Sequence, residues 1–190
     1  MNRILPMMVV AGLCGLAMAD GAVAEAEAHQ AGETAAQATT NAWHEALRAK
    51  VRARTQADLE TYGRDGCRDV ERAYRAYSKS KEAENEHLKT LLEKFPKANR
   101  TGCAVMYAGQ RSKGADAEKW FRLAMEKHGD CMYGDGAQVG AYARFYLAKM
   151  LDREGKKEEA KALRAEILSL YPDARTHRGR KMADFLKQDR

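Results

Sequence analysis

The chain has 190 residues, which is enough for one domain or two very small ones. Hydrophobic residues make up 45% and charged residues 32%, with a formal net charge of +6, so a packed core can form and general disorder is excluded. With 3 prolines and 15 glycines, collagen-like and proline-rich classes are also excluded. Frequent Ala, Lys, Arg, Glu and Leu, together with the absence of sustained two-residue alternation, predict an all-α protein.

The N-terminus has the features of an export signal. Arg3 precedes an apolar run from Ile4 to Leu16, and Ala17-Met18-Ala19 matches a signal-peptidase site. We therefore expect a signal peptide at residues 1–19, with an alternative end at residue 24, and a mature chain in the periplasm or cell envelope, or secreted. The other interpretation is an uncleaved membrane anchor; after cleavage we expect no transmembrane segment.

Residues 20–40 contain almost no large apolar side chains. Such a stretch cannot offset the entropy lost on ordering, so we expect a flexible linker with at most transient helix. The helical domain should then occupy residues 41–190.

This domain shows a series of short amphipathic patterns at helical spacing. The first begins at Asn41, and Gly63 and Gly66 interrupt the pattern before the second begins at Cys67. The pattern predicts further helices over residues 82–95, 101–110, 116–127, 138–152, 157–171 and 176–188, or seven to eight in all. The pattern is interrupted at Phe95-Pro96, His128-Gly129 and Tyr171-Pro172. These breaks suggest units of two helices with a period of about 34 residues, and one insertion at the loop from Cys131 to Val139.

The last unit resembles a tetratricopeptide repeat. The matching positions are Leu147, Ala148, Leu151, Ala160, Ile167 and Pro172. Ala117, Phe121 and Ala124 match in the middle unit, and Leu88, Leu91 and Pro96 match in the first. The chain departs from the family at Arg144, where a tryptophan is usual, and at Val105, where a small residue is usual. The resemblance implies an α-solenoid of antiparallel helix pairs, divergent or Sel1-like; a non-repetitive helical bundle is the alternative.

In this family the first helices of the pairs form a concave surface, which implies that Met106, Phe145 and Lys149 face a partner. The stretch from Asp130 to Phe145 also concentrates glycine with Tyr133 and Tyr142, and we predict that these two tyrosines bind a partner as well. The alternative is that the aromatic side chains fill the seam between helix pairs.

Cys67, Cys103 and Cys131 remain after removal of the signal peptide, and an exported protein usually oxidises such thiols. In the repeat register Cys103 and Cys131 flank one helix pair, so we predict a disulfide between them, with Cys67–Cys103 as the alternative. The third thiol would be buried and free, or redox-active, or bonded to another molecule.

The sequence carries no recognised catalytic motif and predicts neither a metal site nor a cofactor. The only candidate constellation is His128, Asp130 and Cys131, which share one loop but lack a paired set of ligands elsewhere. Basic residues gather at the C-terminus, around Arg178 and Arg180. Export argues against nucleic acid as the partner and leaves an anionic envelope surface, an acidic protein, or a solvated capping helix as the interpretations.

These observations predict an exported, non-catalytic scaffold that binds a protein or peptide. A thiol- or metal-dependent module at the Cys131 loop is the alternative from another class, and an accessory subunit of a larger exported complex is the third.

Overall fold

The protein is described by a computed structural model that covers the backbone of residues 17–188 and the side chains of residue 30 and residues 37–187. Most of the predicted signal peptide, residues 1–16, lies outside the described residues. The chain divides into two units, one ending at Ala46 and the other running from Leu47 to Arg190. No helix of the described part is both long enough and apolar enough to cross a lipid bilayer.

The described residues are all-α, as the composition predicted. The helices are α1 (Ala17–Lys79), α2 (Glu86–Lys94), α3 (Asn99–Arg111), α4 (Gly114–Lys127), α5 (Val139–Arg153), α6 (Lys157–Leu170) and α7 (Met182–Gln188). Between residues 17 and 188 there is no strand, only two isolated β-bridges, Met132 with Gln138 and Arg175 with Lys181.

Residues 20–40 have helical backbone within α1, which differs from the linker that we expected. Their alanine content explains the helix, because alanine loses the least free energy of any residue on entering one. The break predicted at Gly63 is confirmed: its φ of 66° and ψ of 178° interrupt the helical conformation inside α1, and helix resumes through Gly66. The segment of residues 47–62, which precedes this break, is called the strap below.

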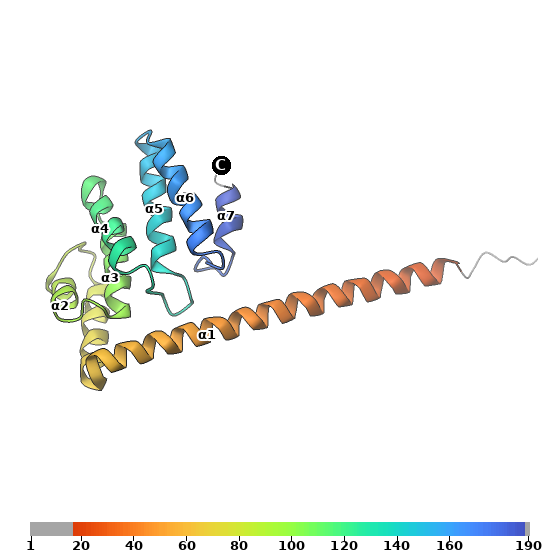
Figure 1. The fold of residues 1–190 in the computed structure, drawn as a ribbon, viewed down its shortest axis with the longest axis horizontal. Helices are drawn as coiled ribbons and strands as arrows, with labels where there is room; N and C mark the ends of the chain where they lie inside the picture. Colours follow the sequence, from red (N-terminus) through yellow and green to blue (C-terminus); the bar gives the residue numbers. More distant parts are fainter. Residues whose placement is uncertain (1–16, 189–190) are drawn as a thin grey trace, which may run out of the picture. The chain divides into compact units, whose positions relative to one another are not determined.

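The core of the second unit is formed by helices that pack in chain order. Figure 1 shows α5, α6 and α7 following α3 and α4 across this unit, and each of α3, α4 and α5 packs against the next helix. Small residues allow close approach: the Phe121 ring of α4 lies against Gly109 of α3, where a Cβ atom would meet it at 2.5 Å. Positions that carry the repeat resemblance are buried here, among them Leu91, Leu147 and Ile167.

Arg144 shows how the chain accommodates its main departure from the repeat pattern. The side chain is buried on α5, and its Nε donates to Glu166 of α6 at 2.8 Å. One Nη donates to the backbone carbonyl of Gly140 at 3.2 Å, and the guanidinium lies 5.4 Å from the centre of the Tyr171 ring. These partners satisfy the buried charge of a residue that departs from the repeat resemblance.

The last predicted helix is shorter than expected, because α7 begins only at Met182. The residues before it form a tight turn in which the Thr176 N–H donates to the Arg180 carbonyl at 2.8 Å and the Gly179 N–H donates to the Thr176 carbonyl at 2.8 Å. Gly179 has a φ of 76°, a left-handed conformation that glycine adopts without strain. Residues 175–181, called the C-terminal turn below, therefore stand out from the helices and form one side of a pocket.

Candidate functional site

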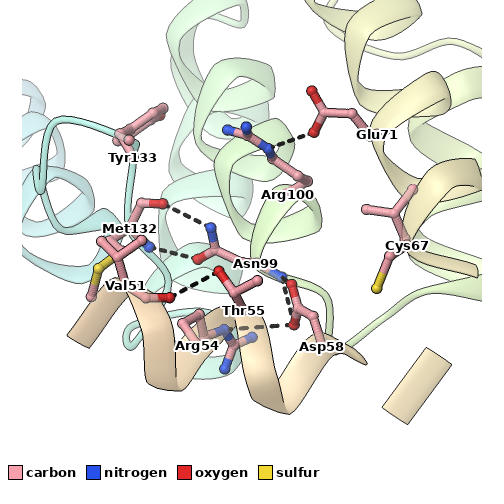
Figure 2. Close-up of a pocket in the computed structure, with 12 residues that line it drawn as sticks. Val51, Arg54, Thr55, Asp58, Cys67, Glu71, Asn99, Arg100, Met132 and Tyr133 are labelled. Atoms are coloured by element: carbon pink, nitrogen blue, oxygen red, sulfur yellow. Dashed lines mark hydrogen bonds and ion pairs between the residues drawn. The ribbon is translucent and has the colours of Figure 1, made fainter. Parts of the chain in front are cut away.

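Two pockets stand out in the second unit, and the first lies between the strap, the adjoining part of α1, and the start of α3 (Figure 2). We call it the polar pocket. It has a volume of about 270 Å³, and its lining residues are Val51, Arg54, Thr55, Asp58, Cys67, Val70, Glu71, Asn99, Arg100, Met132, Tyr133 and Gly134.

The charged side chains of the polar pocket are bound to other parts of the chain. Arg54 of the strap forms an ion pair with Asp130 at 2.6 Å and also donates to the Lys97 carbonyl. Asp58 of the strap accepts a hydrogen bond from the Asn99 N–H at 3.0 Å. Burial raises the pKa of Asp58, and this hydrogen bond and the Arg54 charge oppose the rise.

On the opposite wall, Arg100 pairs with Glu71 at 2.9 Å and stacks over the Tyr74 ring, 4.8 Å from its centre. Burial alone would raise the pKa of Glu71, but hydrogen bonds and charge from Arg75 and Arg100 outweigh it, so the pKa lies below its ordinary value. The polar pocket therefore has cations and anions in balance, each held in place by the chain.

The Asn99 side chain joins α3 to the loop from Cys131 to Val139, which is called the glycine-rich loop below. Its side-chain nitrogen donates to the Met132 carbonyl at 2.9 Å, and its side-chain oxygen accepts from the Met132 N–H at 2.8 Å (Figure 2). The amide thus satisfies both backbone groups of one loop residue, as a neighbouring strand would. This contact fixes the loop that carries Cys131 and Tyr133.

The three cysteines within the described residues, Cys67, Cys103 and Cys131, are free thiols in the structure, so the predicted bond between Cys103 and Cys131 is not formed in it. Both thiols are buried, and they lie close enough that the charge of one raises the pKa of the other. The Cys103 thiol donates to the Met132 carbonyl at 3.5 Å, and Cys131 accepts from Arg54 at 3.6 Å. Each thiol therefore has a contact partner other than sulfur. These contacts are tertiary, so the spacing of the cysteines in the sequence does not predict them. Burial is the main reason that each has a pKa of about 12.

The loop constellation of His128, Asp130 and Cys131 is not arranged as a metal site. No group of three candidate ligands comes together among the described residues. His128 is buried, which lowers its pKa, and the Asp130 carboxylate is directed to Arg54.

The second pocket, called the aromatic pocket, lies between α5, the C-terminal turn and α7. It has a volume of about 310 Å³, and its lining residues are Tyr142, Phe145, Tyr146, Thr176, His177, Arg178, Arg180, Met182 and Phe185. The rings pack on one another: Phe145 is 5.3 Å from Phe185 and 5.7 Å from Tyr146, both nearly edge to face. The residues of this pocket that carry a positive charge, Arg178 and Arg180, are exposed.

The structure separates the residues that were predicted to bind a partner. Tyr142 and Phe145 line the aromatic pocket, and Lys149 lies beside it, with its ammonium group 5.4 Å from the centre of the Phe145 ring. Tyr133 instead lines the polar pocket. The expectation for Met106 is wrong: its side chain is fully buried in the core, because α3 is covered on that side by its neighbours.

His177 links the two pockets and was missed by the sequence analysis. Its ring lies between Tyr133 and Tyr142, at 4.9 Å and 4.7 Å between ring centres, and its Nδ1 is 2.7 Å from the Asp135 carboxylate. Its backbone N–H donates to the Tyr142 hydroxyl at 2.8 Å. Tyr146 and Phe185 were missed as well. The basic cluster at Arg178 and Arg180 was identified in the sequence, but no sequence pattern predicts that it lies beside α5.

Comparisons of the chain with family models, with curated proteins and with solved structures give no match in any of the three.

Proposed function

We propose that this protein is an exported, non-catalytic scaffold that binds a peptide segment of a partner protein in the aromatic pocket. The observation that carries the proposal is the combination in that pocket of a floor of rings with exposed cationic side chains. Aromatic side chains bury a large apolar area with little loss of conformational freedom, and polar groups at the rim select the ligand.

The proposed architecture is a short α-solenoid of antiparallel helix pairs, related to tetratricopeptide repeats. It is supported by the packing of α3, α4, α5 and α6 in chain order and by the short links of residues 112–113 and 154–156. Helices joined by links of this length commonly lie antiparallel. Export is proposed from the signal-like N-terminus, and it places the partner in the periplasm or cell envelope.

The thiol- or metal-dependent alternative receives little support from the geometry. A reactive cysteine is partly exposed and has a lowered pKa, whereas Cys131 is buried and its pKa is raised to about 12. The nearest carboxylate, Asp130, pairs with Arg54 through one oxygen and accepts from the Cys131 thiol through the other, at 3.8 Å, which also raises the pKa of that thiol.

The proposal is tested by binding of purified residues 20–190 to an array of peptides of mixed composition. We expect a subset of the peptides to bind, and binding to weaken at least about tenfold in Phe185→Leu, which keeps an apolar side chain but removes a ring from the pocket. Leu170→Ala is the matched control, because Leu170 is an exposed apolar residue outside the pocket. Absence of binding to any peptide, or equal loss in both variants, would contradict the proposal.

Export has a separate test. Expression of the full chain in a Gram-negative host should give a periplasmic product that begins at Asp20 or Glu25, as measured by intact mass spectrometry. The same spectrum reports whether Cys103 and Cys131 are bonded after export. A cytoplasmic product that retains Met1 would contradict the exported scaffold.

A further inference from the structure

The aromatic pocket has an uneven charge. Its lining includes His177, Arg178 and Arg180 but no aspartate or glutamate. Two carboxylates outside the lining have partners of their own: Asp135 contacts the Nδ1 of His177, a residue of the lining, at 2.7 Å, and Asp184 lies 3.8 Å from Lys187.

The two arginines are available to a ligand. Neither Arg178 nor Arg180 forms an ion pair within the part of the chain that the structure describes, and both are exposed on the C-terminal turn. The Arg180 guanidinium lies over the Phe185 ring, 5.4 Å from its centre, which places the charge at the edge of the aromatic floor. Lys149 is positioned in the same way over Phe145, so cations stand on two sides of the rings.

This arrangement discriminates between classes of ligand. Cages of aromatic side chains can bind cationic ligands. Here, however, Lys149 and Arg180 already lie over ring faces, and no carboxylate lines the pocket to offset a further positive charge. An anionic group would meet two unpaired guanidinium groups, which bind carboxylates with well-defined geometry. The apolar floor would at the same time bury one large side chain.

Building on the proposed function, we infer that the aromatic pocket selects an acidic peptide segment. One large apolar side chain of the segment inserts among Tyr146, Phe145 and Phe185, and flanking carboxylates contact Arg178 and Arg180. The volume of about 310 Å³ fits one such side chain and its backbone, and it is too small for a folded element.

The test is a fluorescence anisotropy titration with four labelled ten-residue peptides. The first carries four glutamates around one tryptophan; the others replace the glutamates by glutamine, the glutamates by lysine, or the tryptophan by alanine. We expect the first peptide to bind most tightly, the glutamine peptide roughly tenfold more weakly, and the lysine peptide more weakly still. Raising the NaCl concentration should weaken binding of the first peptide and leave the glutamine peptide nearly unchanged.

The double variant Arg178→Gln/Arg180→Gln locates the effect. We expect it to remove the preference for glutamate over glutamine, while the glutamine peptide binds as before. Arg153→Gln/Lys161→Gln is the matched control, since it removes two exposed positive charges outside the pocket and should retain the preference.

The outcomes separate this inference from the proposed function. If none of the peptides binds and the array is also negative, the binding function itself fails. If peptides bind but glutamate and glutamine versions are equal, or if both double variants behave alike, the function stands and the acidic selectivity is wrong. Equal binding of polyglutamate without tryptophan, or of a single-stranded oligonucleotide, would overturn the apolar insertion and indicate a general polyanion surface.

Discussion

In the polar pocket, the cationic side chains of Arg54 and Arg100 are held by carboxylates of the chain, whereas Arg178 and Arg180 in the aromatic pocket have no such partners among the residues that the structure describes. The two pockets are of similar volume, about 270 and 310 Å³. Their difference lies in what their polar groups contact. The contacts of the polar pocket fasten the strap and the glycine-rich loop to α3, whereas the exposed guanidinium groups of Arg178 and Arg180 in the aromatic pocket face solvent or a ligand.

This comparison teaches that pocket volume alone does not identify a binding site. A charge that is paired within the chain contributes to folding, and a ligand must displace its partner in order to use it. An exposed charge at the edge of a pocket lined by rings, such as that of Arg180 over Phe185, is available without that cost. Substitutions in the polar pocket should therefore change stability, and substitutions of the two arginines should change ligand selection.

Asn99→Ala is expected to have the largest effect on stability. It leaves the Met132 N–H without its partner and the Met132 carbonyl with only the Cys103 thiol, which costs about 2–4 kcal/mol in the free energy of unfolding. Urea denaturation measures the change. Arg178→Gln in the aromatic pocket is the comparison and should change stability by less than about 0.5 kcal/mol. Similar losses in the two variants would remove the distinction between the pockets.

Gly63→Ala is expected to have the next largest effect. The conformation at φ 66° and ψ 178° is open essentially only to glycine, so alanine there costs about 1–3 kcal/mol and disturbs the junction that positions the strap. Gly134→Ala is a close control: an added Cβ meets no atom within 4 Å at either position, but Gly134 lacks the positive φ. Thermal unfolding of both variants measures the difference, and equal melting temperatures would show that the strap does not depend on this backbone conformation.

The smallest expected effect concerns pH. Burial lowers the pKa of His128 in the folded protein below its value of about 6.5 in the unfolded chain. At pH values between the folded and unfolded pKa, the unfolded chain binds more protons than the folded protein. The contribution of His128 to the free energy of unfolding is therefore fully present above about pH 6.5 and is lost as the pH falls towards the folded pKa.

The measurement is the free energy of unfolding at a series of pH values from about 7.5 to 5. His128→Gln should flatten the acidic part of the curve, whereas His87→Gln, which changes an exposed histidine, should leave it unchanged. A curve for His128→Gln with the same slope as the parent would show that this buried histidine does not couple protonation to folding.

Much of the helical organisation could be predicted from the sequence. The ends at Phe95-Pro96 and Tyr171-Pro172 and the break at Gly63 depend on local backbone preferences, which proline and glycine determine by themselves. The candidate site was predicted less well. Tyr142 and Phe145 line one pocket, and whether they bind a partner stays a prediction; Met106 belongs to the core, and His177 was not recognised.

The amino-acid sequence was enough to predict most of the helical segments and the apolar side of each, because both properties depend on residues within one or two turns of each other, although the extents of α1 and α7 differ from the prediction. The tertiary structure adds that Arg54 reaches Asp130, that the Cys103 and Cys131 thiols each contact a group other than sulfur, and that the C-terminal turn completes a pocket with α5. These contacts join residues from different helices or loops. Periodicity identifies the face of a helix that is buried, but the neighbour that covers it depends on how all the helices pack together.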